Sequence, residues 1–559
     1  MNPHDTPCTL IDALSLTAAK APSTGITVFD RRGQNGERRS YSQLLASAQH
    51  AAGLLAAAGI APGDRVLFCL NTSWDLLEAY FGALLRGACP VLIAPSGALG
   101  GAATHAQKLS TFVELLGARR LICDETTRKE LADFGASAAH VALTPPELRA
   151  LNAPAGLTPP PEAAPGDIAF MQLTSGSTGR QRAVQIRHSN VLANIHALAA
   201  FTHSVPFSGN QRIVSWLPLN HDMGLVGCLL FSIVNGFELF LLRPDSFLAR
   251  PRLWLQTISA GRGTLTPAPN FAYQLCCDRL TDQDLAGLDL SGCRALTGAE
   301  MVQPQTCRAF SEKMSAYGMR PEMLMPSYGM AETTLGITAD VRGRGVRTLP
   351  IPGADKSAGD VVCVGAPVEH TEVRISSPSE PGRFLPEQQI GEVWVNGPSV
   401  FAGYYNDPEA SADALPTVAG RVWLRTGDLG FMHDDELYIT GRIKDLLIIH
   451  GHNLMPHELE WLAEGVTGGG GTERCGAFSV PGGAQGEQAV VVVEVAGTKA
   501  AALPALAHEI RTRVGKVLGL PLSDVVFVKR GQIPKTTSGK VQRRQLRQRF
   551  LEGKLERLG

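Results

Sequence analysis

The chain has little of what marks membrane proteins and nucleic-acid-binding proteins. No apolar stretch reaches the roughly 18 residues of a membrane span, and the best candidate, residues 227–242, is interrupted by Asn235 and Glu238. The 51 Lys and Arg residues are balanced by 52 Asp and Glu, which argues against broad electrostatic capture of nucleic acid or anionic lipid. We therefore expect no nucleic-acid partner and no membrane span.

Disulfide patterns and a secretion signal are also missing. The eleven cysteines are an odd number without a Cys-x-x-Cys pair, and only Cys276 and Cys277 lie close together. This pattern favours reduced, buried thiols over a disulfide framework. The N-terminus, MNPHDTPCTLIDAL, lacks the basic-then-apolar order of a signal peptide. These observations predict a cytoplasmic protein.

The 559 residues suggest three to four domain-sized units, and 44% apolar residues suit large buried cores. Helical periodicity at residues 41–58 and 74–86 alternates with apolar runs at 65–70 and 89–93, a pattern typical of parallel strands in an α/β fold. The composition then changes several times along the chain. The predicted subdomains are α/β at roughly 1–165 and 166–360 and β-rich at 361–443, followed by a last unit, 444–559, that opens with a strand at 441–451.

One loop has the composition of a phosphate-binding segment. Residues 173–184, LTSGSTGRQRAV, follow the strand-like run IAFMQL. Such a loop can present backbone N–H groups and hydroxyls to phosphate oxygens, and an ordinary polar turn is the alternative. Neither this loop nor KTTSGK at 535–540 has the spacing of a Walker A motif.

Further segments hold isolated polar residues that could carry chemistry. His221 and Asp222 are adjacent within SWLPLNHDMGLVG, where a core histidine is the alternative to a catalytic one. Glu332, in PSYGMAETTL, could hold Mg²⁺ together with substrate phosphates, or cap a helix. His450, His452 and His457 have no Cys or carboxylate at ligand spacing, which disfavours a metal site. The remaining segments are TGDLG (426–430), GRIKD (441–445), HGHNLMPHELE (450–460) and IPKTTSGKVQR (533–543).

In this order, the segments between residues 170 and 545 resemble the adenylate-forming superfamily of acyl-CoA synthetases, luciferases and peptide-synthetase adenylation domains. A narrower resemblance is to the fatty acyl-AMP ligases, which typically pass the acyl group to an acyl carrier protein and use coenzyme A poorly. The segments that carry it are SWLPLNHDMGLVG, PAPNFAYQLC, TGAEMV, PSYGMAETTL and residues 426–460. Ala331 and the His-Asp-Met-Gly run agree with that branch.

Two departures keep alternatives open. The superfamily loop usually ends Gly-x-Pro-Lys-Gly, whereas Gly179 is followed here by Arg-Gln-Arg-Ala, with Arg182 keeping a cation at the Lys position. The stretch 336–364 is also shorter than the insertion of the acyl-AMP branch. An acyl-CoA synthetase is therefore one alternative, and a catalytically silent adenylate-binding scaffold is another.

The resemblance implies an adenylate-forming fold, with an AMP-binding N-terminal domain at 1–443 and a mobile α+β lid at 444–559. A fatty acid would be activated with ATP and Mg²⁺, pyrophosphate would leave, and the acyl group would pass to the phosphopantetheine thiol of a carrier protein. Lys540 would bridge the carboxylate and the α-phosphate, Glu332 would bind Mg²⁺, His221 would border the acyl site and Lys444 would be the hinge.

The resemblance also assigns the nucleotide and acyl contacts. The nucleotide would be held by Thr174, Ser175, Gly176, Ser177, Thr178, Gly179, Arg182, Gly298, Ala299, Glu300, Tyr328, Gly329, Asp428 and Arg442. Met223, Gly224, Phe271 and Tyr273 would line an acyl pocket, with a core role as the alternative for the apolar residues. Residues 541–559 predict an amphipathic helix whose basic face is either solvated or a docking surface for an acidic carrier protein.

Overall fold

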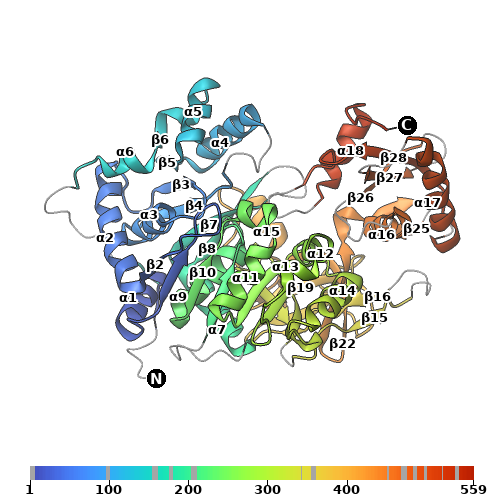
Figure 1. The fold of residues 1–559 in the computed structure, drawn as a ribbon, viewed down its shortest axis with the longest axis horizontal. Helices are drawn as coiled ribbons and strands as arrows, with labels where there is room; N and C mark the ends of the chain where they lie inside the picture. The colour runs from blue at the N-terminus through green and yellow to red at the C-terminus, as the bar shows by residue number, and fades with distance from the viewer. Residues whose placement is uncertain are drawn as a thin grey trace.

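The computed structural model describes residues 7–95, 101–153, 162–174, 181–202, 211–340, 343–353, 360–449, 452–467, 475–482, 487–495, 500–518, 520–535 and 541–558. The N-terminal elements and the C-terminal unit lie at opposite ends of the molecule (Figure 1). Among the described residues, no helix combines the length and the apolar character that crossing a bilayer requires. The eleven cysteines all lie in the described residues, none of them forms a disulfide, and nine are buried.

The first sheet has six strands in the order β6-β5-β3-β4-β7-β8. Its strands are β3 (Arg65–Cys69), β4 (Cys89–Leu92), β5 (Arg120–Cys123), β6 (Ala142–Leu143), β7 (Ile168–Thr174) and β8 (Arg182–Arg187). The accompanying helices are α2 (Tyr41–Ala57), α3 (Trp74–Leu85), α4 (Ala102–Leu116), α5 (Glu125–Asp133), η2 (Ser137–Val141) and α6 (Pro145–Arg149). β3 to β6 are parallel, which confirms the α/β pattern, while β7 and β8 form an antiparallel pair.

The second sheet has nine strands in the order β17-β14-β13-β12-β11-β9-β10-β1-β2. They are β1 (Gly25–Val28), β2 (Glu37–Ser40), β9 (Arg212–Ser215), β10 (Glu238–Leu241), β11 (Leu265–Pro269), β12 (Arg294–Gly298), β13 (Leu324–Gly329), β14 (Gly336–Ala339) and β17 (Ala366–Pro367). The sheets do not follow the predicted boundary at residue 165, because β1 and β2 belong to the second sheet and β7 and β8 to the first.

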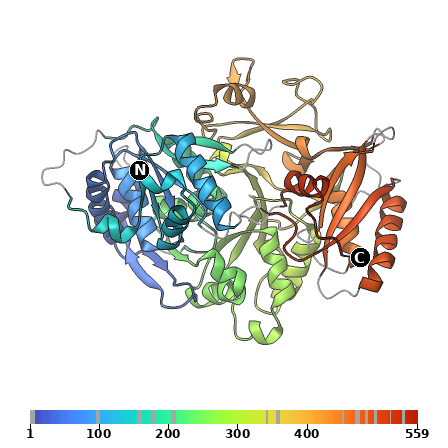
Figure 2. The same cartoon turned by 90° about the horizontal axis from the view of Figure 1, so that it is seen from above.

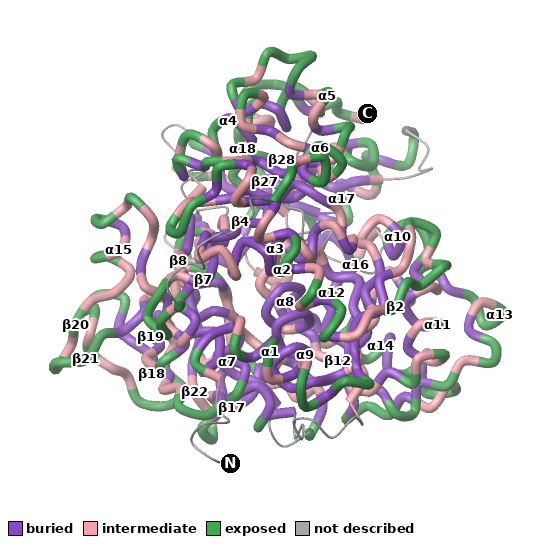
Figure 3. The backbone as a smooth tube through the Cα atoms, turned by 90° about the vertical axis from the view of Figure 1, so that its left-hand side faces the viewer, coloured by how far each residue is buried: buried purple, intermediate pink, exposed green. Residues whose placement is uncertain are grey.

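Helices and short turns complete this second layer. They are α1 (Leu10–Lys20), α7 (His188–Phe201), α8 (Asp222–Gly224), the π-helical turn η3 (Leu225–Leu230), α9 (Phe231–Asn235), α10 (Pro244–Ala249), α11 (Arg252–Gly261), α12 (Asn270–Arg279), α13 (Asp282–Leu285), α14 (Pro304–Ser315), η4 (Pro321–Met323) and η5 (Ala331–Thr333). The tube in Figure 3 shows the central strands as buried and peripheral elements such as α13 as largely exposed.

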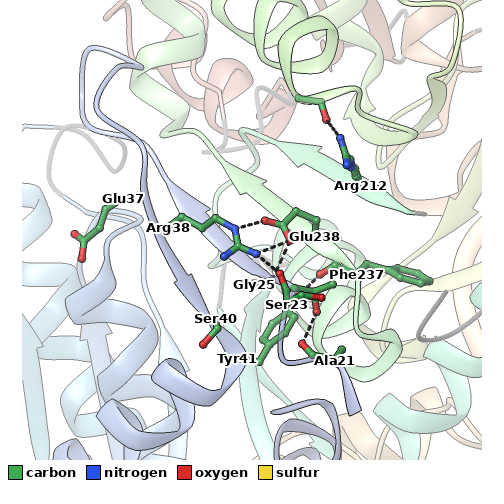
Figure 4. A network of polar contacts seen from close by, with 12 residues as sticks. Ala21, Ser23, Gly25, Glu37, Arg38, Ser40, Tyr41, Arg212, Phe237 and Glu238 are labelled. Carbon is green, nitrogen blue, oxygen red and sulfur yellow. Dashed lines mark hydrogen bonds and ion pairs between the residues drawn. The ribbon is translucent and has the colours of Figure 1, made fainter. Parts of the chain in front are cut away.

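A polar network fastens the N-terminal strands to the second sheet (Figure 4). Arg38 on β2 donates from Nε to Glu238 Oε1 on β10 at 2.6 Å. The other carboxylate oxygen of Glu238 accepts from the backbone N–H of Gly25 on β1 at 3.1 Å. The hydroxyl of Tyr41 donates to the carbonyl of Phe237. Glu238 thus links three neighbouring strands and supplements the backbone pairing of β1 with β10.

The β-rich part confirms the predicted series of short strands. Its four-stranded antiparallel sheet consists of β18 (Glu372–Ser376), β19 (Gly391–Asn396), β22 (Leu424–His433) and β23 (Glu436–Arg442). Beside it lie β15 (Thr348–Pro350), β16 (Asp360–Val362), α15 (Pro408–Ala414), β20 (Thr417–Val418) and β21 (Arg421–Val422). Figure 2 shows this part between the N-terminal sheets and the C-terminal unit.

The C-terminal unit has a three-stranded sheet and its own apolar clusters. Its elements are β24 (Leu447–Ile449), β25 (His452–Leu454), α16 (Pro456–Thr467), β26 (Cys475–Pro481), β27 (Glu487–Val495), η10 (Ala500–Ala502), α17 (Leu503–Leu518), β28 (Leu522–Lys529) and α18 (Arg543–Leu551). The predicted continuous strand at 441–451 is wrong, because the 3₁₀ turn η7 (Ile443–Asp445) separates β23 from β24. The predicted C-terminal helix is present but ends at Leu551.

Candidate functional site

A cleft of about 1840 Å³ runs between the N-terminal sheets, the β-rich part and the C-terminal unit. It lies at the carboxyl ends of β7, β12 and β13, where ligands of open α/β sheets typically bind. The predicted residues that line it are Thr174, Arg182, His221, Met223, Ala299, Glu300, Tyr328, Gly329, Glu332, Asp428, Arg442 and Lys444. Ser175, Gly176, Ser177, Thr178, Gly179 and Lys540 lie outside the described residues.

Asp428 joins two other predicted site residues. The register of β22 and β23 sets Asp428 opposite Arg442, and Arg442 Nε lies 2.8 Å from Asp428 Oδ1. The Tyr328 hydroxyl donates to Asp428 Oδ2 at 2.6 Å, and the backbone N–H of Asp428 donates to Thr426 Oγ1 at 3.0 Å. The negative charge of Asp428 raises the pKa of Arg442. The result is a carboxylate at the cleft wall with an arginine and a tyrosine fixed beside it.

Two glycines allow close backbone contacts at the ends of β12 and β13, one between these strands and one between β13 and the residue before β14. A Cβ on Gly298 would lie 2.7 Å from the carbonyl oxygen of Ser327, and one on Gly329 would lie 1.8 Å from that of Leu335. Between these strands and the cleft, Ala299 has a φ of +66°, a strained conformation for a residue with a side chain. Such strain is concentrated at ligand sites. The cleft wall at the ends of β12 and β13 is therefore formed largely by backbone atoms in close contact.

Glu332 is a buried carboxylate at the same end of the cleft. The residue is 8% exposed, and its Oε1 accepts a hydrogen bond from the Tyr404 hydroxyl at 2.8 Å. Burial raises the pKa of Glu332, and the hydrogen bond from Tyr404 opposes that shift. A cation bound here would favour the ionised form. Tyr404 was not predicted as a site residue, and no spacing in the GYYND segment separates it from its neighbour Tyr405.

The strand after the phosphate-type loop presents Arg182. It pairs with Thr174 across β7 and β8, so both residues flank the loop. Arg182 Nε lies 3.2 Å from Asp407 Oδ2, and its guanidinium carbon lies 5.1 Å from the centre of the Tyr404 ring. Arg182, which stands at the position of the usual Lys, therefore lines the cleft and is held there by contacts with the segment 401–407.

The acyl-site predictions divide into two groups. Met223 lines the cleft, as does His221. Gly224 does not line it: a Cβ at this position would lie 2.3 Å from the Pro218 carbonyl oxygen, so Gly224 allows a close backbone contact within the turn. Phe271 and Tyr273 are not among the cleft-lining residues: both are buried in an aromatic cluster, where the Tyr273 hydroxyl donates to the carbonyl of Leu296 at 2.7 Å. This burial supports the core role that was the alternative for them, and the acyl role stays a prediction.

Several residues that were not predicted individually line the apolar part of the cleft. Gly227 and Phe231 follow Met223 at intervals of four residues, and Leu198 and Leu335 line it as well. The π-helical turn of residues 225–230 has a wider turn than an α-helix and keeps the three residues of this row on the cleft side. Apolar periodicity reveals neither the wider turn nor the side that faces a cavity.

Lys444 lies within η7, where the chain passes from the β-rich part into the C-terminal unit. Its neighbour Asp445 lies 3.4 Å from Arg543 Nη1, and Arg543 Nη2 also lies 2.6 Å from Glu460 Oε2. Glu460 is fully buried. The junction is therefore linked electrostatically to α16 and α18 of the C-terminal unit.

Comparisons with known proteins agree with this geometry. The family model described as AMP-binding enzyme matches residues 15–405. Long-chain-fatty-acid–AMP ligase FadD26 of Mycobacterium marinum is 34% identical over 93% of this chain and 93% of its own. A putative acyl-CoA synthetase of Caulobacter vibrioides is 32% identical over 98% of this chain and 96% of its own.

A solved structure from a study of fatty acyl-adenylate ligases from E. coli and L. pneumophila is 30% identical, with a TM-score of 0.88 and 98% of each chain covered. This likeness confirms the predicted adenylate-forming fold. The matched family model covers more than two thirds of the chain and both α/β sheets that border the cleft. The chain belongs to the family of AMP-binding enzymes.

Proposed function

We propose that the protein is a fatty acyl-AMP ligase: a fatty carboxylate attacks the α-phosphate of ATP, pyrophosphate leaves, and an acyl adenylate forms. The observation that carries this proposal is the Asp428–Arg442–Tyr328 group, a fixed carboxylate facing the same cleft as the buried Glu332. A carboxylate suits the two hydroxyls of a ribose, because it accepts hydrogen bonds with both oxygens. The names of the relatives support a fatty acid as the second substrate.

The main task of the site is to bring two anions together. Arg182 and the hydroxyls and N–H groups of residues 174–179 would hold the phosphates, and Lys540 would bridge the carboxylate and the α-phosphate. Preorganised donors of this kind stabilise charge that develops in the transition state. Ala299 and Tyr328 would contact the adenine, and the apolar row from Met223 to Phe231 would receive the acyl chain.

Glu332 fits a role in holding Mg²⁺. It is a buried carboxylate whose ionisation is disfavoured by burial, so a divalent cation would compensate its charge. Mg²⁺ prefers one or two carboxylates together with substrate phosphates, and the cleft offers that combination. When bound, the ion would neutralise phosphate charge. Glu332 would hold it, with Tyr404 fixing the orientation of the carboxylate.

For the second step we propose that residues 444–559 act as a lid that rotates about Lys444. Separate apolar clusters in this unit and the short turn at 443–445 support such a motion, because hinges are a few residues at element ends. Rotation would withdraw Lys540 and admit the phosphopantetheine thiol of an acyl carrier protein. The acyl group would then leave AMP and form a thioester.

In the structure, several arginines of the segment 541–559, predicted to form a basic face, are engaged in contacts within the C-terminal unit. Arg543 pairs with Glu460, Arg547 donates from Nε to the carbonyl of Ser479 at 2.7 Å, and Arg557 pairs with Asp524. Reversing Arg547 would therefore damage the unit itself. Arg544 is exposed and lines the cleft rim, which makes it the better probe of a carrier protein.

ATP–pyrophosphate exchange that depends on a fatty acid tests the first step, and its absence would favour a silent scaffold. Thioester formation with a carrier protein, compared with coenzyme A, tests the second. We expect Arg544→Glu to slow carrier loading and leave exchange unchanged, with the exposed Arg308→Glu on α14 as the control. Efficient acyl-CoA formation without an effect of Arg544→Glu would identify an acyl-CoA synthetase.

A further inference from the structure

The segment 401–407 connects the two halves of the phosphate end of the cleft. On one side it runs along β8: the N–H of Gln185 donates to the carbonyl of Gly403 at 3.0 Å, and that of Tyr405 to Ala183 at 2.9 Å. On the other side, the N–H of Phe401 donates to the carbonyl of Glu332 at 2.9 Å. One short piece of chain thus fixes both the strand of Arg182 and the turn of Glu332.

Tyr404 lies at the centre of this segment and contacts both charged residues. Its hydroxyl donates to Glu332 Oε1 at 2.8 Å, and its ring lies 5.1 Å from the guanidinium carbon of Arg182. Its own position is fixed, because its backbone N–H donates to Ser411 Oγ at 2.8 Å and its ring packs edge-on against Phe401. The side chain is therefore a rigid connection between a cation and an anion.

The arginine makes this connection possible. Its guanidinium can stack on an aromatic face while its Nε bonds to a carboxylate, two contacts that a Lys ammonium cannot make together. Asp407, which takes the Nε contact at 3.2 Å, is itself fixed as the N-cap of α15, with Oδ1 accepting from the N–H of Ala410 at 3.1 Å. Among the described side chains, Arg182 pairs with Asp407 and not with Glu332.

We propose that Tyr404 is a positioning residue that keeps Arg182 and Glu332 apart and aimed at the same triphosphate. Opposite charges in a partly buried site attract more strongly than in bulk water, and a direct ion pair would occupy both groups that the substrate needs. The hydroxyl bond restrains Glu332, and the ring restrains Arg182. This inference rests on the proposed function, because it assumes that Mg²⁺ and ATP phosphates occupy this end of the cleft.

The test uses the full chain and calorimetric binding of ATP in the presence of Mg²⁺. Tyr404→Phe keeps the stacked ring and removes only the hydroxyl. We expect the Kd for Mg·ATP to rise about 10- to 100-fold, the usual effect of losing a hydrogen bond to a charged group. Tyr41→Phe is the control, because it also removes a single tyrosine hydroxyl bond, one that is buried away from the cleft, and it should leave this Kd unchanged.

A double-mutant cycle separates positioning from general damage. In the Glu332→Gln background, Tyr404→Phe should have little further effect on the Kd, because the charged partner is already gone. The Tyr404→Phe variant should also raise the KM for Mg·ATP in pyrophosphate exchange more than it lowers kcat. Additive effects in the cycle, or an unchanged Kd in the single variant, would overturn the proposal.

Two further outcomes have defined meanings. Absence of Mg·ATP binding by the natural chain would overturn the proposed function, and the positioning role would fall with it. Binding by the natural chain with no effect of Tyr404→Phe would overturn only the positioning role.

If Tyr404→Phe does not fold, a double-mutant cycle of Arg182→Gln and Glu332→Gln in the natural chain replaces it. If Arg182 and Glu332 are coupled through Tyr404, their effects on the Kd for Mg·ATP should be non-additive. Additive effects would refute the positioning role.

Discussion

Replacement of Asp428 by Ala tests the nucleotide end of the site most directly. The substitution removes the acceptor of the Tyr328 hydroxyl and the partner of Arg442. A hydrogen bond to a charged group contributes about 1.5–3 kcal/mol to stability. The Arg442 pair adds at most about 1 kcal/mol, because that side chain is 56% exposed and solvent screens it. We therefore expect the free energy of unfolding to fall by about 2–4 kcal/mol.

The same substitution should raise the KM for ATP about 10- to 100-fold, since the charged acceptor proposed for the ribose is lost. Preference among fatty acids of different length should not change. The residues that line the apolar part of the cleft, such as Met223 and Phe231, belong to the segment 221–235 and not to the β22–β23 hairpin. Pyrophosphate exchange with a series of fatty acids measures both quantities, and denaturant unfolding measures the stability.

Glu436→Gln is the matched control for this experiment. Glu436 lies on the same hairpin, its side chain is 2% exposed and it pairs with Arg347 and Arg344, but it does not line the cleft. The control should lose stability and keep its KM for ATP. An equal rise in KM for both variants would mean that Asp428 acts only through the stability of the hairpin. A shift in fatty-acid preference would refute the assignment of Asp428 to the nucleotide.

Three further results are expected. Lys540→Ala should slow adenylation by about 10²–10³-fold, because one preorganised charge donor is lost. Thioester formation from supplied acyl adenylate should be slowed much less. Equal losses in both steps would exclude a role of Lys540 in the first step. Burial lowers the pKa of His188 to about 4, and its Nδ1 accepts from the N–H of Leu10. As the pH falls, the histidine is protonated at higher pH in the unfolded chain than in the folded one. The free energy of unfolding should therefore decrease between pH 6.5 and 4, by about 2 kcal/mol at pH 5. In His188→Gln, this contribution to the pH dependence of the free energy of unfolding should be absent. Gly329→Ala should abolish pyrophosphate exchange, because its Cβ would overlap the carbonyl oxygen of Leu335, and a fully active variant would contradict that geometry.

Local patterns were sufficient for the elements whose periodicity is unambiguous. The predicted helix at 41–58 and strand at 65–70 correspond to α2 and β3 within one residue at each end. Asp428 and Arg442 were predicted from separate motifs, and the structure brings them together because the two strands that carry them pair in a hairpin. A short loop between two strands makes this kind of proximity predictable.

Other parts of the site depend on tertiary packing that no local pattern encodes. Phe271 and Tyr273 have the apolar character that suits a tunnel or a core equally well, and only the structure shows that they are buried in the aromatic cluster around Trp254. Tyr404 reaches Glu332 only because residues 402–405 run beside β8, more than 200 positions earlier in the chain. The π-helical turn at 225–230 could not be predicted either, because nothing in its sequence, LVGCLL, distinguishes it from an α-helical turn.

The place of β1 in the second sheet affects how the protein is made. Gly25 bonds to Glu238, which follows 213 residues later in the chain. At about 5–20 residues per second, the ribosome needs roughly 10–40 s to supply that partner. During this interval β1 and β2 have no neighbouring strand from β10, and exposed strand edges of this kind invite aggregation. We therefore expect residues 25–40 of the nascent chain to need protection by chaperones, although in the finished protein β1 and β2 are paired within the nine-stranded sheet.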